Sequence, residues 1–374
     1  MVPNGWKQTT LDKVLTIGGG KDYKHLEEGS IPVYGSGGYM LSVSDYLYDG
    51  ESVCIGRKGT IDKPIFLKGK FWTVDTLFYT HSFKDSEPYY IYQFFQTVPW
   101  RRLNEASGVP SLSKSIINKV KINLPPLPEQ LKIAKILSTW DKAISTTECL
   151  IDNSKQQKKA LMQQLLTGKK RLLDDSGKAF EGEWEEVKLS NVAEVVMGSS
   201  PKSASYNDNS EGLPLIQGNA DIKNRKSVPR TYTSEVTKKC RIGDILLSVR
   251  APVGTVAKSE HNACIGRGIS AISAKKHHVQ EYLYQWLLWF EPRWEKYSQG
   301  STFEAVNSND IKSLHLAIPE HSEQVKIASA LSNADQEIEL LEQQLADLKQ
   351  EKKALMQQLL TGKRRVIVDE KEVA

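Results

Sequence analysis

The sequence has no apolar run that approaches the length of a membrane span, and its four cysteines are scattered. Cys54, Cys149, Cys240 and Cys264 form no CxxC pair, which argues against a zinc site and fits a reducing cytoplasm. The opening residues, Met-Val-Pro-Asn-Gly-Trp-Lys, do not have the pattern of a signal peptide. We therefore expect a cytoplasmic protein with no membrane segment.

Catalytic motifs are also missing from the sequence. Gly177 and Gly182 have the spacing of a phosphate-binding loop, but Glu183 stands where a lysine would reach the phosphates. Residues 17–20, Ile-Gly-Gly-Gly, are better explained by a glycine turn than by a cofactor-binding motif. The seven histidines have no metal-ligand spacing, and no Ser/His/Asp set can be assembled. The sequence predicts no catalytic residue, metal or cofactor in this chain.

The composition is that of an ordinary water-soluble protein. The chain has 374 residues, of which 39% are hydrophobic and 25% charged, and this length allows two or three domains. The net charge of +5 permits nucleic-acid binding but does not establish it.

A long internal repeat organises the chain. Residues 160–169, Ala-Leu-Met-Gln-Gln-Leu-Leu-Thr-Gly-Lys, return as residues 354–363 at an offset of 354 − 160 = 194. The same offset holds upstream without a gap, back to Pro125 and Pro319. The chain therefore contains one unit twice.

Each copy of the repeat is predicted to be one long helix, over residues 125–167 and 318–361. Prolines stand where each helix begins and Thr-Gly where each ends, and apolar residues recur in steps of four and three. The predicted seam residues are Ile133, Leu137, Ile144, Leu161, Leu165, Ile327, Leu331, Ile338, Leu341, Leu345, Leu348, Leu355 and Leu359. About 40 helical residues span roughly 60 Å. The other copy is the obvious cover for this stripe, although each helix could instead pack against its own globular domain.

The segments around the helices form two related blocks. Residues 1–124 and 184–317 contain short β-rich runs between Gly, Asp and Pro turns, whereas residues 168–183 are expected to be a linker and residues 362–374 a tail. The matched segments are Trp6 with Trp184, residues 32–36 with 214–219, residues 50–53 with 243–246, residues 57–61 with 250–256, and helices at 89–103 and 282–290. We predict an α+β fold with two mixed, mainly β domains joined by two long helices. These helices form an antiparallel coiled coil with pseudo-twofold symmetry.

Glycine-rich segments that carry Arg or Lys are the candidates for holding nucleic acid. Glycine lets backbone N–H groups approach phosphates, and arginine can contact phosphate or guanine through two hydrogen bonds. The predicted DNA-binding residues are Arg57, Lys58, Arg250 and Arg267, with Tyr34, Ser36, Gly38, Gln217, Asn219 and Asp221 as groups that could read bases. Ordinary surface turns remain the alternative, but Arg57 and Arg250 stand at matched places. The aromatic helices at 89–95 and 282–290 are expected to be core rather than stacking surfaces.

These features together resemble the specificity subunit of a type I restriction–modification system. The resemblance covers nearly the whole chain and depends on Leu-Pro-Pro-Leu-Pro-Glu-Gln at 124–130 and on Gln-Gln-Leu-Leu-Thr-Gly-Lys at 163–169 and 357–363. A minor departure is Ser322, which replaces proline before the second Glu-Gln.

The resemblance implies that each block is a target recognition domain for one half of a bipartite double-stranded DNA sequence. The helices would set the gap between the half-sites and dock two modification subunits. Those partners would bind S-adenosylmethionine and methylate adenine, and restriction subunits would use ATP and Mg to translocate and cleave DNA. The chain itself would have no catalytic activity.

Two other classes of protein stay open from the residues alone. A coiled-coil scaffold would bind proteins only and would show no salt-dependent DNA binding. An autonomous DNA enzyme would be active as the isolated chain.

Overall fold

The computed structural model describes residues 2–294 and 305–368, and the chain divides into two compact units. The first unit combines residues 1–149 with 343–374, and the second unit consists of residues 150–342. Each unit therefore contains one of the two blocks together with a part of each long helix.

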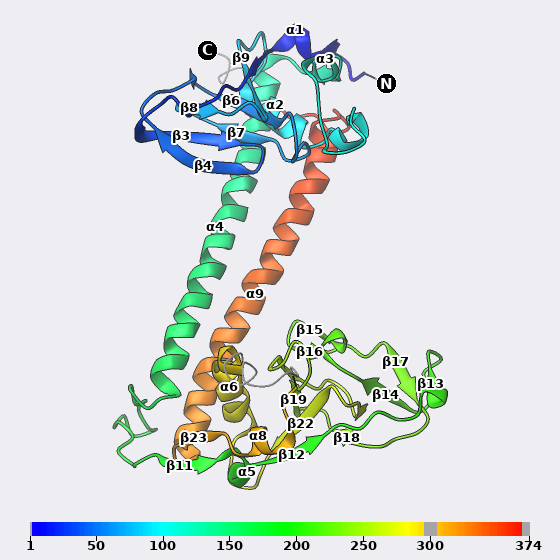
Figure 1. Ribbon diagram of the computed structural model, residues 1–374. Coiled ribbons are helices and arrows are strands. Elements are labelled where there is room, and N and C mark those ends of the chain that lie inside the picture. The colour runs from blue at the N-terminus through cyan, green and yellow to red at the C-terminus, as the bar shows by residue number, and fades with distance from the viewer. Residues whose placement is uncertain (1, 295–304, 369–374) are drawn as a thin grey trace. The chain divides into compact units, whose positions relative to one another are not determined.

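Two long helices carry the sequence repeat. They are α4 (Leu127–Leu165) and α9 (His321–Leu359), each of 39 residues, and both their first and last residues differ by 194 (321 − 127 and 359 − 165) (Figure 1). The prediction of two matched helices is confirmed, and each helix begins shortly after a proline. Across the described part of the chain, no helix is both long and apolar enough to span a membrane.

The two helices are antiparallel within each unit. In both units, ion pairs join increasing residue numbers on α4 to decreasing numbers on α9. The pairs are Asp141–Lys352 and Glu148–Lys349 in the first unit, and Lys155–Glu342 and Lys158–Asp335 in the second. The predicted antiparallel orientation is thus observed in each half of the duplication.

None of the predicted seam residues is exposed. Seven are buried: Ile133, Leu137, Leu165, Ile327, Leu331, Ile338 and Leu359. The other six are half-buried: Ile144, Leu161, Leu341, Leu345, Leu348 and Leu355. In the first unit, Ile133 and Leu137 of α4 belong to the same core as Leu359 at the end of α9. Both coverings considered from the sequence therefore occur, because the start of each helix packs on its own block and on the end of the other helix.

Within its described residues, the first unit contains a two-stranded sheet, β1-β10, and two four-stranded sheets, ordered β2-β9-β6-β7 and β4-β3-β8-β5. Its strands are β1 (Lys7–Thr10), β2 (Thr16–Gly19), β3 (Glu28–Gly35), β4 (Gly38–Val43), β5 (Tyr48–Asp49), β6 (Ser52–Gly56), β7 (Ile65–Leu67), β8 (Lys70–Thr73), β9 (Leu77–His81) and β10 (Lys121–Leu124). Its short helices are α1 (Leu11–Val14), α2 (Pro88–Phe95), η1 (Trp100–Leu103) and α3 (Lys114–Asn118). The helix predicted over 89–103 is thus split into α2 and η1, with Pro99 directly before η1.

The second unit follows the same plan, with a sheet β11-β23, a six-stranded sheet β12-β22-β19-β20-β16-β15 and a five-stranded sheet β13-β17-β14-β21-β18. Its strands are β11 (Glu185–Lys188), β12 (Ala193–Met197), β13 (Tyr206–Asn207), β14 (Leu213–Ile216), β15 (Ile222–Lys223), β16 (Lys226–Ser227), β17 (Thr231–Thr233), β18 (Lys239–Cys240), β19 (Ile245–Ser248), β20 (Val256–Lys258), β21 (Ala263–Ile265), β22 (Ile269–Ala274) and β23 (His315–Ile318). Its short helices are α5 (Leu189–Val192), η2 (Ser203–Ser205), η3 (Asn219–Asp221), α6 (Gln280–Phe290), η4 (Glu291–Arg293) and α8 (Ser308–Lys312).

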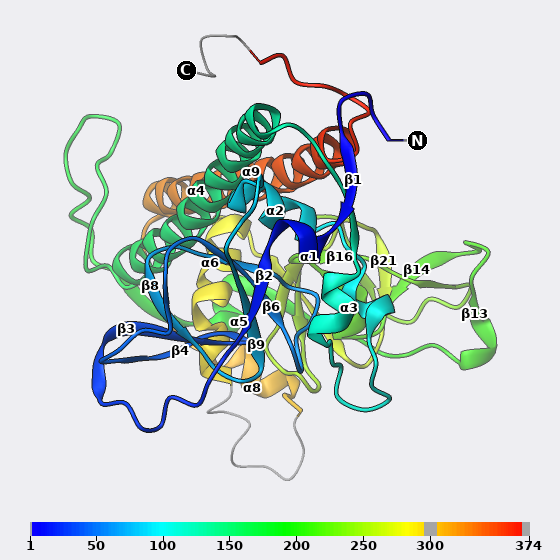
Figure 2. The same ribbon diagram turned by 90° about the horizontal axis from the view of Figure 1, so that it is seen from above.

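The aromatic helices α2 and α6 belong to the cores of their units, as the sequence predicts. Tyr90 and Phe95 of α2 are fully buried, and so is Tyr282 of α6. Figure 2 shows α2 next to the long helices in the first unit. Pro88 occupies the first turn of α2, and the Glu87 side chain accepts a hydrogen bond from the Tyr90 backbone N–H, which caps the helix.

A buried carboxylate joins the two chain segments that make up the first unit. Glu129, at the start of α4, is 4% exposed. It accepts a hydrogen bond from Trp6 Nε1 at 3.0 Å and two from Arg365 at 2.6 and 2.7 Å. Hydrogen bonding to Glu129 raises the pKa of Arg365. The segment after α9 is therefore bound to the start of the chain.

The second unit repeats this arrangement around Glu323, which lies 194 residues after Glu129. Glu323 is fully buried and accepts two hydrogen bonds from Arg171, both at 2.7 Å, and one from Trp184 Nε1 at 3.2 Å. Leu172 packs against the core of the same unit. The segment after α4, expected to be a linker, thus begins with residues that hold the second unit together.

We predict that Arg365→Ala and Arg171→Ala each lower the free energy of unfolding by about 2–3 kcal/mol, because each leaves a buried carboxylate without its cation. Arg365→Lys should recover part of the loss, since lysine restores the charge but not the two parallel hydrogen bonds. Urea unfolding of the purified chain measures the change.

The control for these variants is Lys326→Ala, which removes an ion pair with the exposed Asp175. Exposed pairs contribute little, so this change should stay within about 0.5 kcal/mol of the parent. Arginine variants as stable as the Lys326 variant would show that the two buried carboxylates do not depend on their cations.

Candidate nucleic-acid interface

Three turns of the first unit meet beside each other and form what we call the first loop cluster, residues 34–38, 57–59 and 74–76. The Arg57 backbone N–H donates to the Thr76 carbonyl at 2.8 Å, and the Val74 N–H donates to the Tyr34 carbonyl at 3.0 Å. A Cβ placed on Gly59 would lie 3.3 Å from Ser36 Oγ. The structure therefore brings Tyr34, Ser36, Arg57 and Lys58 together, although they come from different strands.

The cations of the first loop cluster are available to a ligand. Arg57 and Lys58 are both exposed, and neither forms an ion pair with any carboxylate that the structure describes. The Arg57 guanidinium makes one long contact, 3.5 Å, to the Asp75 carbonyl. Unpaired, exposed cations on a rigid turn are suited to phosphate contacts.

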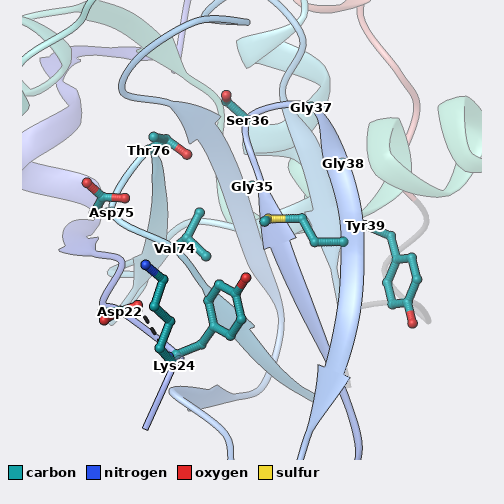
Figure 3. Close-up of a pocket in the computed structure, with 12 residues that line it drawn as sticks. Asp22, Lys24, Gly35, Ser36, Gly37, Gly38, Tyr39, Val74, Asp75 and Thr76 are labelled. Carbon is teal, nitrogen blue, oxygen red and sulfur yellow. Dashed lines mark hydrogen bonds between the residues drawn. The ribbon is translucent and has the colours of Figure 1, made fainter. Parts of the chain in front are cut away.

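A hollow of about 700 Å³ adjoins this cluster. It is lined by residues 22–24, 35–40 and 74–76. Figure 3 shows the Lys24 ammonium directed toward the loop that contains Val74 and Asp75, while the Tyr39 ring points away from the hollow. Lys24 was not among the residues predicted from the sequence, because the segment that contains it, residues 20–27, has no distinctive motif.

The hairpin between β3 and β4 presents a residue that sequence reasoning missed. Gly38 has a φ of +111°, which the tight turn after Gly37 requires. Tyr34 is half-buried beneath Tyr39, with ring centroids 6.1 Å apart, whereas Tyr39 is 62% exposed. Tyr39 is therefore better placed than Tyr34 to contact a ligand.

A fourth segment of the first unit, residues 104–111, lies against the same cluster. The Gly59 N–H donates to the Pro110 carbonyl at 2.9 Å, and Lys58 pairs with Ser111. Asn104 holds the loop closed by accepting from the backbone N–H groups of Ala106 and Ser111. The sequence signal that could have identified this loop is its Ser-Gly-Val-Pro-Ser run, which is typical of a turn.

The second loop cluster consists of residues 198–200, 216–219, 249–250 and 266–268. The Gly266 N–H donates to the Ile216 carbonyl at 2.8 Å, and the Gly268 N–H donates to the Gln217 carbonyl at 3.1 Å. Arg267 is exposed, and its backbone N–H donates to Ser200 Oγ at 3.1 Å. The predicted residues Gln217, Asn219, Arg250 and Arg267 therefore come from neighbouring turns of one cluster.

Asp221 has a structural task rather than the base-reading role considered from the sequence. The residue is 3% exposed. It accepts one hydrogen bond from the Gln217 backbone N–H at 2.8 Å and another from Arg230 Nε at 2.9 Å. A base cannot reach this carboxylate, because the side chain is almost fully buried. Asp221 instead fixes the turn that presents Gln217 and Asn219.

The two clusters correspond closely, but the matched cations differ from the sequence prediction. The Val249 N–H donates to the Gly268 carbonyl, as the Arg57 N–H donates to the Thr76 carbonyl. Arg57 thus corresponds to Val249, at an offset of 249 − 57 = 192. The prediction that Arg57 matches Arg250 is wrong by one residue.

Lys58 is the true counterpart of Arg250. Lys58 forms an isolated β-bridge with Ser111, and Arg250 forms one with Ala305. The predicted match of residues 50–53 with 243–246 is wrong by one residue as well. Gly56 pairs with Leu77 and Ser248 pairs with Ile269 in equivalent strands, so the true offset is 248 − 56 = 192 rather than 193. Matching arginine with arginine gave the wrong correspondence, because the equivalent positions are set by the pairing of neighbouring strands and not by residue type.

A glycine explains how each cluster is built. A Cβ on Gly20 would lie 1.9 Å from the Val74 carbonyl oxygen, and a Cβ on Gly198 would lie 2.1 Å from that of Gly266. Both glycines follow the first strand of their main sheet, so the chain can pass directly against the cluster loop. The glycine run at 17–20 is thus explained by close packing. The turn expected here from the sequence is wrong, because Thr16–Gly19 form strand β2 and pair with β9.

The described residues contain no group of three or more His, Cys, Asp or Glu side chains that could hold a metal ion. Burial raises the pKa of the Cys54 thiol to about 12, so this cysteine stays protonated at neutral pH. What the two clusters offer a ligand is therefore hydrogen bonding and positive charge.

Comparison with known proteins agrees with this architecture. The family model described as "Type I restriction modification DNA specificity domain" matches residues 3–153 and 181–350. The chain is 35% identical to the putative type I restriction enzyme MjaX specificity subunit of Methanocaldococcus jannaschii over 88% of this chain and 80% of that protein. It is 26% identical to the MjaVIII specificity subunit of the same organism, over 86% and 78% of the two chains.

Solved structures show the same fold. The S subunit of a type I restriction–modification system from M. genitalium aligns over 96% of this chain and 97% of its own, with a TM-score of 0.70 and 14% identity. A chain from a study of assembly and conformational transition in a type I system aligns over 96% and 98%, with a TM-score of 0.59 and 22% identity. The alternative of a scaffold without DNA recognition is not favoured by the family model and the curated relatives. The chain belongs to the family of type I restriction enzyme DNA specificity subunits.

Proposed function

We propose that this chain selects the DNA sequence for a type I methylase complex, with residues 1–124 and 184–317 each reading one half of a bipartite target. The observation that carries this proposal is the duplicated loop cluster. Each copy presents a cation, Lys58 or Arg250, at the equivalent position of an equivalently hydrogen-bonded turn. Two equivalent clusters on a duplicated frame suit two separate half-sites.

In this proposal the exposed cations position the DNA and the neighbouring polar groups specify it. Arg57, Lys58, Arg250 and Arg267 would contact phosphate or guanine. Ser36, Gly38 and Tyr34, which lies beneath the more exposed Tyr39, would form the reading surface of the first half-site. Gln217 and Asn219 would belong to that of the second.

The helices would act as the spacer between half-sites and as docking sites for two modification subunits. Their sequences are nearly the same over the repeat, so the chain would offer each modification subunit an equivalent surface. S-adenosylmethionine would be bound by the modification subunits, which would methylate adenine. ATP and Mg would be bound by restriction subunits, which would cleave DNA in the cytoplasm.

The experiment that tests this function is DNA binding by the assembled methylase, titrated over a range of salt concentrations. We expect affinity for one bipartite duplex well above that for unrelated duplexes, with a steep fall as salt rises. A complex that assembles but binds all duplexes equally would contradict a recognition role.

We predict that Lys58→Ala and Arg250→Ala each weaken DNA binding and reduce the slope of log K against log salt by about 0.9, the value for one phosphate contact. Arg57→Ala should have a similar effect, because Arg57 is exposed next to Lys58 in the same turn. The matched control is Lys68→Ala in the first unit, because Lys68 is already paired with Glu51 at 2.9 Å. If affinity and slope stay at the parent values in all three variants, the phosphate assignment is wrong.

The spacer role predicts the effect of lengthening a helix. Four residues inserted near Leu166 should move one block by about 6 Å along the axis. At about 3.4 Å per base pair, the gap in the target should lengthen by one or two base pairs while the half-sites stay unchanged. Methylation mapping by sequencing measures both.

A destabilised seam would give a different result from a longer spacer, since four residues break the heptad register. The damaged protein would be weak or inactive and would show no new gap. An active variant whose gap is unchanged would contradict the spacer role.

A further inference from the structure

A partly buried polar cluster joins the first recognition block to both long helices. Asp141 of α4 accepts hydrogen bonds from Tyr89 Oη at 2.8 Å and Gln93 Nε2 at 2.6 Å, both from α2. Its other oxygen accepts from Lys352 Nζ of α9 at 2.6 Å. We call these four residues the first node, because three helices meet at one carboxylate.

The second unit contains an equivalent node. Gln285 Nε2 of α6 donates to Asp335 Oδ2 of α9 at 2.8 Å, and Lys158 of α4 donates to Asp335 Oδ1. Gln285 corresponds to Gln93 at the block offset, 285 − 93 = 192, and Asp335 corresponds to Asp141 at the helix offset, 335 − 141 = 194. Glu281, at the position that corresponds to Tyr89, forms a hydrogen bond with Gln285 rather than with Asp335.

Stability alone does not explain these nodes. Gln93 and Gln285 are fully buried, and the Oε1 atom of each has no hydrogen-bond partner among the residues that the structure describes. A buried oxygen without a partner is unfavourable, and leucine would fill a similar volume without that loss. The Lys352 side chain is 8% exposed and interrupts the apolar seam, as Lys158 does in the other copy.

Directional bonds at this junction do what apolar packing cannot. Apart from a hydrogen bond from the Glu87 backbone N–H to Gln130 at the start of α4, the contact between α2 and the long helices consists mainly of side chains of a shared hydrophobic core. Hydrophobic contact is non-directional, so it tolerates small rotations, whereas hydrogen bonds lose strength quickly when donor and acceptor move out of line. A single polar residue in an apolar seam is known to fix geometry in this way.

We propose that the two nodes fix the orientation of each recognition block on the helix pair, so that Gln93, Asp141, Gln285 and Asp335 are positioning residues for the gap between the half-sites. This inference rests on the proposed function, in which the helices space two DNA readers. Among the described residues, no hydrogen bond or ion pair joins a node to either loop cluster, so the nodes act on the gap and not on the bases read.

The test is Gln93→Leu and Gln285→Leu, alone and together, in the assembled methylase. We expect a melting temperature equal to or above the parent, because the orphaned oxygens are removed. Methylation of targets whose gap is one base pair longer or shorter should rise by about tenfold relative to the native gap, the size of one lost recognition contact. The half-sites and the rate on the native gap should remain near parent values.

The matched control is Glu148→Gln, which removes an exposed ion pair with Lys349 on the same two helices. This variant should keep the parent gap preference. Leucine variants that fold, methylate and keep the parent preference would overturn the inference. If the leucine variants do not fold, Asp141→Asn is tested instead, because it keeps the side-chain shape and weakens the hydrogen bonds to the charged carboxylate. A weaker preference for the native gap length supports the inference, and an unchanged preference overturns it.

Failure of the proposed function would look different. The parent complex would then methylate without any fixed gap, before a variant is compared. A fixed gap in the parent that is equally fixed in the leucine variants contradicts only the role of the nodes.

Discussion

An apolar stripe along a helix of 39 residues has to be covered, and this chain covers it with a second copy of the same helix and, at each helix start, with a recognition block. Roughly 25 cal/mol is gained per Å² of apolar surface removed from water, so the long seam is a large stabilising term. Antiparallel pairing has a topological consequence. The end of each helix arrives beside the start of the other, and each compact unit is completed by a segment from the opposite half of the chain.

Polar groups determine which segment from the opposite half of the chain completes each unit. Glu129 and Glu323 are buried at the helix starts and are neutralised by Arg365 and Arg171, which follow the ends of the opposite helices. An unpaired buried carboxylate is strongly unfavourable, so each helix start selects the correct helix end. The nodes at Asp141 and Asp335 add a second polar contact further along each pair. Apolar burial supplies the stability, and these charged groups determine which segments meet.

The long helices could be predicted almost to their ends, because the repeat contains both the heptad pattern and the proline and Thr-Gly residues that mark where each helix begins and ends. The clusters could be predicted only in part. The glycines beside Arg57 and Arg267 predict that both arginines lie in turns. That Lys58 is the counterpart of Arg250 depends on how the strands pair, and the pairing residues are far away in sequence. Asp221 looked like a polar group for a ligand, because sequence does not reveal that Arg230 and a backbone N–H already occupy it. Tyr39 was missed because exposure is a property of the folded hairpin.

The central claim is that the two halves of the duplicated chain are equivalent modules. The most direct measurement exchanges residues 7–124 with residues 185–318, leaving both helices in place, and maps methylation in cells that also make the modification subunit. The pseudo-twofold symmetry expected from the repeat would convert the exchanged protein into the original arrangement by rotation. The account therefore predicts the same bipartite sequence and the same gap, read from the opposite strand. A folded, active protein with a different target or a different gap would contradict the equivalence of the two halves.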